Sequence, residues 1–162
     1  MMLTPIKVAH SPEEKFREYL ASRPRPQRFT SPQRDLIRYI FKQHQHFDAE
    51  ELCAAADREG LQASRATIYR TLSKLVEAGL LRRVPLGERV VYDHDYGYPQ
   101  HAHLHCTQCS RMIEVTSSEL ENLVPILAGK QQFHANSYNL VVRGICAECN
   151  KARTMKRRLD LI

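Results

Sequence analysis

The sequence of 162 residues lacks the features of a membrane or secreted protein. It has no N-terminal segment in which charged residues precede an apolar stretch, and no apolar run approaches the ~18 residues that a membrane-spanning helix needs. Internal repeats and low-complexity tracts are also absent. We therefore expect a cytoplasmic protein without a membrane partner. Its 43% hydrophobic content is sufficient for one ordinary domain or two small ones.

The sequence also lacks the short motifs of zinc enzymes. Neither the His-Glu-x-x-His of metalloproteases nor the His-x-Glu of zinc deaminases occurs. A zinc hydrolase that uses His101, His103 and a bound water is therefore the weaker alternative. We expect a protein that is not an enzyme and has no small-molecule substrate.

Cysteine is scarce, with five residues in the chain, but four of them form two Cys-x-x-Cys pairs. Cys106 and Cys109 form the first pair, and Cys146 and Cys149 form the second. A tight Cys-x-x-Cys turn directs two sulfurs at one centre, so two such turns predict the four-thiolate shell of a structural Zn(II) ion. Disulfides or free thiols are the alternative, and nothing else in the sequence indicates secretion. The fifth, Cys53, is expected to be a small buried residue.

Acidic residues are missing from one basic stretch of the chain. The net charge is +6, and most of the positive excess lies in residues 1–92. Arg23, Arg25, Arg28 and Arg34 follow one another without an intervening acid. Such a run suits a polyanionic partner, most simply nucleic acid, although a solvated basic face is the alternative.

Residues 1–92 are predicted to form a winged-helix domain. N-terminal caps followed by hydrophobic residues at helical spacing predict four helices, of which the leading one covers residues 11–22. They begin at Ser11, Thr30, Asp48 and Ser64; the first ends near Ala21, the third near Gly60 and the fourth at Gly79. Two β-like runs, Leu80–Val84 and Arg89–Tyr92, are expected to form a hairpin around Pro85–Glu88. The last three of these helices, followed by the hairpin, have the layout of a winged helix.

The remaining residues are predicted to form a hinge and a small α/β domain. The hinge is placed at residues 93–100, where turn-forming and charged residues concentrate, and the domain covers residues 101–150. Its expected elements are a strand at Met112–Val115, a helix opened by a capping box at Ser118 and ending near Leu127, and a strand at Tyr138–Arg143. Residues 151–162 form a basic tail, expected to be a solvated or frayed helix. The fold class is therefore α+β.

The fourth helix has the pattern of a recognition helix. Its core positions recur at helical spacing, which places its polar residues on other faces. The core positions are Ile68, Leu72, Leu75 and Val76; the polar residues are Arg65, Thr67, Tyr69, Arg70 and Ser73. Helix-turn-helix proteins present such side chains to base edges and phosphates. An amphipathic helix with an ordinary polar face is the alternative.

Several motifs in this order resemble the ferric uptake regulator (Fur) family of metal-dependent repressors. They are Ala66-Thr67-Ile68-Tyr69-Arg70-Thr71-Leu72, Glu77-Ala78-Gly79-Leu80, His101-x-His103-x-x-Cys106-x-x-Cys109 and Cys146-x-x-Cys149. The resemblance implies a winged helix joined by a hinge to a dimerisation domain, and a homodimer that binds double-stranded operator DNA. It implies that Tyr69 and Arg70 contact DNA, and that Arg25 and Arg28 reach a narrow minor groove.

A second metal site is suggested by the histidines before the first cysteine pair. On an extended strand His101 and His103 point to one side, although exposed histidines would show the same spacing. The resemblance implies a regulatory site there and adds His46, Asp93 and Glu114 as ligands, with His94, Asp95 or His105 as further candidates. Mixed nitrogen and oxygen ligands suit Fe(II), which we expect first, or Mn(II), Co(II) or Zn(II).

The chain departs from the family pattern at a third metal site. Where many members have two histidines and an aspartate, it has Gln100, Ala102 and Tyr138, and only Glu121 remains. We therefore expect this site to be absent. At Asp93 the chain resembles the peroxide-sensing branch of the family, whereas at Glu114 it resembles the iron sensors. Peroxide, zinc and manganese sensing therefore remain alternatives to iron sensing. A constitutive DNA-binding protein with two structural metals is a further alternative.

Overall fold

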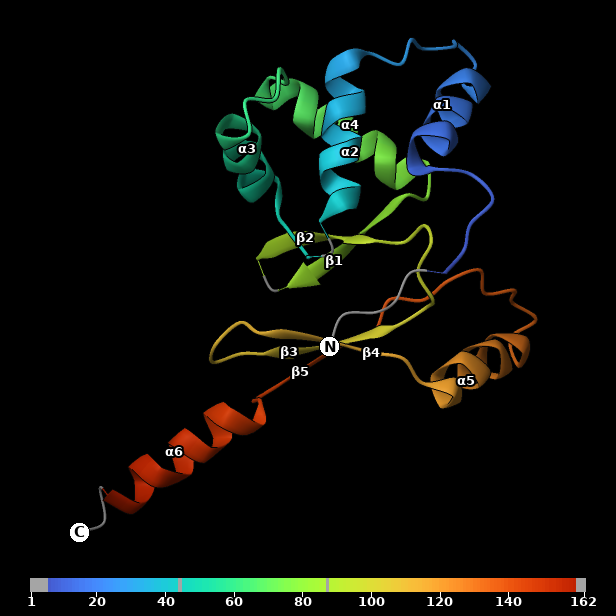
Figure 1. Ribbon diagram of the computed structural model, residues 1–162. Coiled ribbons are helices and arrows are strands. Elements are labelled where there is room, and N and C mark those ends of the chain that lie inside the picture. The colour runs from blue at the N-terminus through green and yellow to red at the C-terminus, as the bar shows by residue number, and fades with distance from the viewer. Residues whose placement is uncertain (1–5, 44, 87, 160–162) are drawn as a thin grey trace. The chain divides into compact units, whose positions relative to one another are not determined.

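The computed structural model describes residues 6–43, 45–86 and 88–159, which divide into two compact units. The N-terminal unit ends at Tyr98 and the C-terminal unit begins at Pro99. Figure 1 labels the helices and strands of both units. Among the described residues, no helix is both long and apolar enough to cross a membrane.

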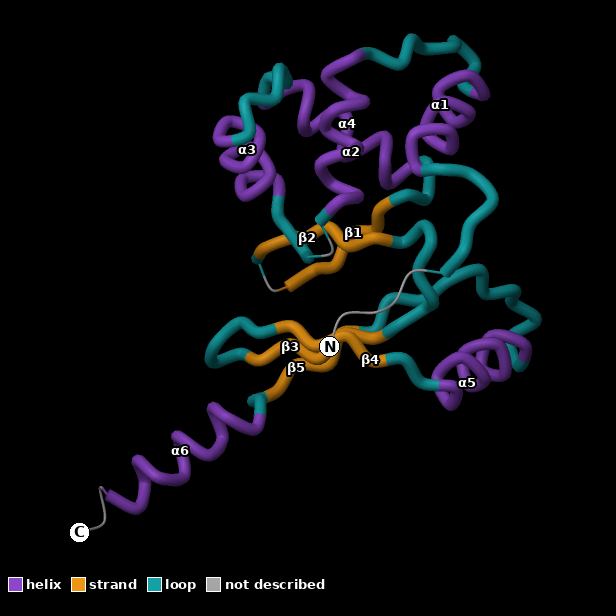
Figure 2. Tube along the Cα trace, in the orientation of Figure 1, coloured by secondary structure: helices purple, strands orange, loops and turns teal. Residues whose placement is uncertain are grey.

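The N-terminal unit contains four helices followed by a two-stranded hairpin (Figure 2). The elements are α1 (Pro12–Ser22), α2 (Ser31–Lys42), α3 (Ala49–Arg58), α4 (Arg65–Glu77), β1 (Leu81–Leu86) and β2 (Arg89–His94). Side chains at the helix starts satisfy backbone N–H groups that have no partner within the helix. Ser11, Asp48 and Ser64 each accept a hydrogen bond from the backbone three residues later. All four helices therefore begin where the caps predict.

The core of this unit is formed by one apolar face from each helix. Phe16, Leu36, Leu52 and Leu72 are each at most 3% exposed and belong to one cluster. Burial of a side chain of this size contributes roughly 1.5–3 kcal/mol. On α4 the predicted core positions are buried, except that Val76 is only partly so. The polar positions of α4 therefore face away from the core.

The hairpin differs from the prediction at its turn. β1 continues through Pro85 and Leu86, and Pro85 pairs with Val90. Proline is tolerated because the N–H that it lacks is not needed on the unpaired side of an edge strand. β2 also continues through Asp93 and His94, which were assigned to the hinge. Asp93 is therefore held in a strand.

The C-terminal unit contains a three-stranded sheet and two helices. The elements are β3 (Ala102–Cys106), β4 (Met112–Val115), α5 (Ser118–Gly129), β5 (Val141–Gly144) and α6 (Ala147–Leu159). The strand order is β4-β3-β5, with β3 antiparallel to β4 and parallel to β5. The central strand β3 therefore carries His103, His105 and Cys106 in the middle of the sheet, with His101 before it and Cys109 in the turn after it.

Three boundaries in this unit differ from the prediction. Ser117, not Ser118, caps α5 by accepting a hydrogen bond from the Leu120 N–H. The last strand begins at Val141 and not at Tyr138. The final helix begins at Ala147, so the basic tail extends a helix that already contains Cys149. The second cysteine pair thus lies at a helix N-terminus.

Candidate metal centres and nucleic-acid interface

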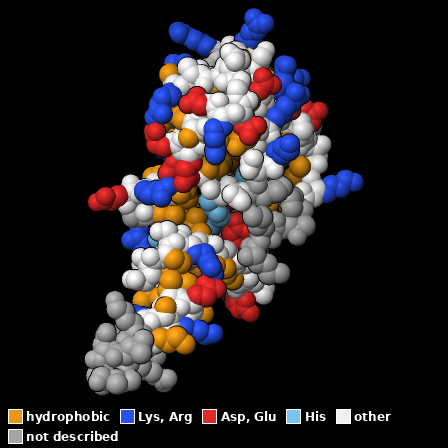
Figure 3. Space-filling model, turned by 60° about the vertical axis from the view of Figure 1, so that its left-hand side comes forward, with side chains coloured by type: hydrophobic (Ala, Val, Ile, Leu, Met, Phe, Trp, Pro, Cys, Tyr) orange, Lys and Arg blue, Asp and Glu red, His pale blue; other side chains and the backbone are white. Residues whose placement is uncertain are grey.

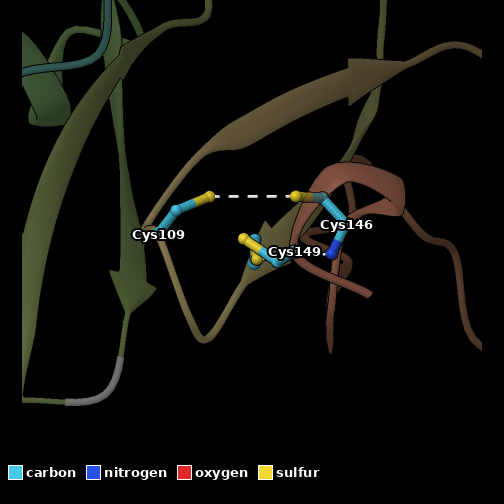
Figure 4. A group of neighbouring side chains, drawn as sticks. Cys109, Cys146 and Cys149 are labelled. Atoms are coloured by element: carbon cyan, nitrogen blue, oxygen red, sulfur yellow. Dashed lines mark hydrogen bonds between the residues drawn. The ribbon is translucent and has the colours of Figure 1, made fainter. Parts of the chain in front are cut away.

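The four paired cysteines come together in the C-terminal unit. Cys106 ends β3, Cys109 lies in the following turn, Cys146 precedes α6 and Cys149 lies in its first turn. All four sulfurs lie within 4.8 Å of one another, and the Cys109 and Cys146 sulfurs are 3.8 Å apart (Figure 4). A disulfide bond would be about 2.05 Å long. Thiolates about 2.3 Å from one zinc ion in a tetrahedron lie about 3.8 Å apart, so the cluster fits such an ion.

Backbone hydrogen bonds prepare one of these thiols for ligation. The N–H of Cys146 donates to the Cys106 sulfur at 3.3 Å. This bond, with others from the backbone of Cys109 and Gln108, lowers the pKa of Cys106 to about 6. Hydrogen bonds with the Cys146 and Cys109 side chains raise the pKa of Cys149 to about 12. Protons are therefore held unequally by the four thiols, and a metal that binds them has to displace those that remain.

The predicted regulatory ligands of the C-terminal unit share one region of its sheet. His101 and His103 are buried, and their ring centroids are 4.8 Å apart. The His101 Nδ1 lies 2.9 Å from the Pro99 carbonyl oxygen. If Nδ1 donates to that oxygen, Nε2 keeps the lone pair that a metal requires. Glu114 on β4 is paired across the strands with His103, so both side chains belong to one face of the sheet.

The N-terminal unit brings the other two predicted ligands together. The Nε2 of His46 lies 3.3 Å from Oδ1 of Asp93. The neighbouring residues Phe47 and Tyr92 form an isolated antiparallel bridge with backbone hydrogen bonds of 3.3 and 2.7 Å, and their rings stack. This bridge holds the segment before α3 next to β2. A partly buried imidazole beside a buried carboxylate is a suitable pair of ligands for a divalent transition metal.

The three further candidate ligands lie in different environments. His94 is buried, its Nε2 lies 3.1 Å from the Ile40 carbonyl oxygen, and its ring meets Phe41 edge-on. Asp95 lies 4.0 Å from Arg82. His105 is half-buried and has the same strand parity as His103. These contacts give His94 a packing role in the N-terminal unit.

The predicted DNA-contacting residues all reach the surface, but two of them are held by an acid. Arg65 donates to the Glu50 carboxylate at 2.6 and 2.7 Å, and the Tyr69 hydroxyl donates to it at 2.5 Å. The Arg65 and Tyr69 hydrogen bonds lower the pKa of Glu50, and the bond to Glu50 raises the pKa of Tyr69. Arg70 is exposed, and the Thr67 hydroxyl lies 3.0 Å from that of Ser64.

The basic segment between α1 and α2 is also at the surface. Arg25 and Arg28 are both exposed. On the face shown in Figure 3, Lys and Arg side chains lie next to Asp and Glu side chains. Because the charges are mixed, a DNA-binding surface is better identified from individual arginines than from a single basic patch.

Sequence reasoning missed two residues that contact the predicted ones. Glu50 is near the start of α3, and no local pattern connects it to α4. Arg82 contacts Asp93, and the hairpin register pairs these two residues directly. The Arg82 contact could have been found from the hairpin pattern, whereas the Glu50 contact depends on how two helices pack.

The residues at the expected lost metal site line a cavity. Gln100, Glu121 and Tyr138 surround a volume of about 260 Å³ together with Pro99 and Val124, among others. Ala102 is buried in β3. The absence of a metal at this place stays a prediction.

Comparison with known proteins identifies related sequences. The model of the ferric uptake regulator family matches residues 25–143. The ferric uptake regulation protein of Synechococcus elongatus is 30% identical over 126 residues, which cover 75% of this chain and 86% of that protein. The peroxide-responsive repressor PerR of Staphylococcus aureus is 25% identical over 138 residues, which cover 85% and 93% of the two chains.

Solved structures share the fold. The ferric uptake regulator of Helicobacter pylori, described with three functional metal-binding sites, superposes with a TM-score of 0.74 at 18% identity over 91% of this chain and 97% of that chain. The Pseudomonas aeruginosa regulator with manganese gives 0.65 at 26% identity, over 74% and 90%. A zinc uptake regulator complexed with zinc and DNA gives 0.59 at 23% identity, over 91% and 99%.

Proposed function

Because this chain belongs to the ferric uptake regulator family of metal-responsive transcriptional regulators, we propose that it is a homodimeric repressor whose metal-loaded form binds operator DNA. The main supporting observation is the contact between His46 and Asp93 in a unit with winged-helix layout. Fe(II) is the first regulatory metal that we propose, and Mn(II) or Zn(II) would suit the same ligands.

The four-cysteine cluster is proposed to hold structural Zn(II). The close approach of the four sulfurs and the lowered pKa of Cys106 support this role, because zinc binds thiolates. The cluster also connects the end of β3 to the start of α6. Zinc bound there would contribute folding free energy to a unit with few buried side chains.

The regulatory ion is proposed to take ligands from both units. His46 and Asp93 would come from the N-terminal unit, and His101, His103 and Glu114 from the C-terminal unit. An ion that binds all of them fixes one arrangement of the two units and shifts the population towards it. If that arrangement places two recognition helices one turn of DNA apart, metal binding promotes operator binding.

The homodimer is proposed to form through the C-terminal unit. Within α5, all of which is described, no residue is buried. Ile126 and Leu127 of this helix are 57% and 51% exposed, and Phe133, which follows the helix, is 67% exposed. A helix this apolar without a buried residue is expected at a protein interface.

The DNA contacts are proposed to come from α4 and from the segment before α2. Arg65, Thr67, Tyr69 and Arg70 would approach the major groove, and Arg25 and Arg28 the minor groove. Each good base contact contributes about 1–3 kcal/mol of discrimination, so most affinity has to come from phosphates and from dimerisation.

One experiment tests the proposal and its nearest alternatives. Operator duplexes are selected from a random library with Mn(II)-loaded protein, and binding is then titrated by fluorescence anisotropy with Fe(II), Mn(II) or Zn(II) under anaerobic conditions. The protein should retain only its cysteine-bound zinc at the start. Affinity that does not change on metal addition would support a constitutive DNA-binding protein instead.

Peroxide sensing is the second candidate function. It is favoured by aspartate at position 93 and by the similarity to the Staphylococcus aureus repressor. Repeating the Fe(II) titration after peroxide treatment separates the two. Loss of DNA binding together with oxidation of His46 or His101, found by mass spectrometry, would assign the chain to the peroxide sensors.

A further inference from the structure

Arg82 binds the carboxylate that we propose as a metal ligand. Arg82 on β1 and Asp93 on β2 are directly opposite in the hairpin register. Both Nε and Nη2 of Arg82 lie 2.7 Å from the same carboxylate oxygen, Oδ2. The two side chains are only 12% and 6% exposed. The contact is therefore a charge-assisted hydrogen-bonded pair that is largely shielded from water.

The two oxygens of Asp93 consequently have different surroundings. Oδ2 accepts from Arg82, whereas Oδ1 lies 3.3 Å from the Nε2 of His46. An ion beside His46 would meet Oδ1 first. It could gain Oδ2 as a second ligand only by displacing the guanidinium.

We propose that Arg82 sets the metal concentration at which the protein responds. It restricts Asp93 to binding through Oδ1, and its positive charge opposes that of the incoming divalent cation. This inference deepens the proposed function, because it assumes that His46 and Asp93 bind the regulatory metal.

The charges around Asp93 indicate that Arg82 lowers the affinity for the metal. Neutral His46 and ionised Asp93 would together present one negative charge to the ion, and Arg82, which also lies 4.0 Å from Asp95, offsets part of it. At a separation of about 6 Å and an effective dielectric constant of about 20, repulsion between a divalent cation and one guanidinium alone would weaken metal binding roughly ten-thousandfold. Partial displacement of Arg82 would reduce this effect, so we expect at least a tenfold change.

An orienting role for Arg82 predicts the opposite sign. Loss of an outer-shell hydrogen bond to a metal ligand usually weakens metal binding by roughly 10- to 100-fold. The sign of the change therefore distinguishes a residue that limits affinity from one that only positions Asp93.

The test uses the full chain with zinc retained in the cysteine cluster and Mn(II) as the probe. Free Mn(II) is measured by electron paramagnetic resonance at fixed pH for the wild type, Arg82→Gln and Arg83→Gln. Arg83 is an exposed neighbour on the same strand whose guanidinium lies 5.9 Å from the Tyr92 ring centroid. Its replacement changes the net charge by the same amount without removing the contact to Asp93.

We expect Arg82→Gln to bind Mn(II) at least tenfold more tightly and Arg83→Gln to stay within about twofold of the wild type. The metal concentration for half-maximal DNA binding should fall by the same factor in Arg82→Gln. Equal affinities of the two variants, or weaker binding by Arg82→Gln, would overturn the inference.

Removal of one partner from a buried ion pair can prevent folding. Arg82→Lys therefore serves as a second variant, checked by circular dichroism. Its ammonium group is a flexible point charge that cannot reproduce the planar arrangement of two donors. Because lysine keeps the positive charge, we expect the Mn(II) affinity of Arg82→Lys to lie between those of the wild type and Arg82→Gln, and weaker binding than the wild type would contradict the proposal.

Asp93→Asn separates this inference from the proposed function. If the wild type binds no Mn(II) beyond the cysteine cluster, or if Asp93→Asn binds it equally well, the proposed ligand set is wrong and the inference fails with it. If Asp93→Asn loses binding and Arg82→Gln behaves like Arg83→Gln, only the inference about Arg82 fails.

Discussion

Glu50 forms an ion pair with Arg65, one of the residues that we propose to contact DNA. Arg65 lies at the start of α4, and its side chain and that of Glu50 are 63% and 62% exposed. An exposed ion pair of this kind is weak because water and salt screen it. Replacing Glu50 by Gln should release Arg65 from most of this interaction. Binding of DNA should then strengthen by no more than about fivefold.

The assay is anisotropy with a random-sequence duplex over a series of salt concentrations. One additional phosphate contact should steepen the slope of log affinity against log salt by about 0.9. Glu13→Gln is the matched control, because Glu13 accepts from exposed Arg38 at 2.7 Å, away from α4. An unchanged slope for Glu50→Gln, or weaker binding than the control, would refute the reasoning.

Other predictions concern the cysteine cluster, the apolar surface and the core. Because the pKa of Cys106 is lowered to about 6, its thiol is mostly protonated at pH 5 and mostly ionised at pH 7.5. Zinc binding should therefore release about one proton more at pH 5 than at pH 7.5, as measured by calorimetry in buffers of different ionisation enthalpy. An equal number of released protons at the two pH values would contradict this. Ile126→Glu should yield a monomer in size-exclusion chromatography with light scattering, whereas Glu119→Gln at the exposed start of α5 should not. Leu72→Ala, at a fully buried position, should lower the free energy of unfolding by about 2–5 kcal/mol in urea titrations, and a loss below 1 kcal/mol would exclude tight packing there.

Local signals predicted the helix starts well because each cap involves only residues within one turn. Ser11 and Asp48 show this directly. Ser117 and Ser118 offered two adjacent caps, and the sequence did not distinguish them. The hairpin was predicted, but its turn was placed too early because Pro85 is a stronger turn signal than a strand residue. An edge strand, which the sequence does not identify, tolerates that proline.

The candidate sites also include some residues that local sequence patterns predicted and others that they did not. The cysteine cluster could be predicted from spacing, because each pair is local and only the meeting of the pairs is long-range. His46 and Glu114 have no such spacing, and only the family resemblance indicated them. The Glu50 contact arises from the packing of α3 against α4. No sequence period describes that packing.

The bridge between Phe47 and Tyr92 has a mechanical consequence. One proposed metal ligand precedes Phe47 and the other follows Tyr92, and the cap of α3 begins at the next residue, Asp48. Two backbone hydrogen bonds and a ring stack connect this short segment to the hairpin. Glu50, which accepts hydrogen bonds from Arg65 and Tyr69, lies in the first turn of the helix that starts directly after this segment. The proposed metal ligands and the side chains proposed to contact DNA are therefore connected through the start of α3.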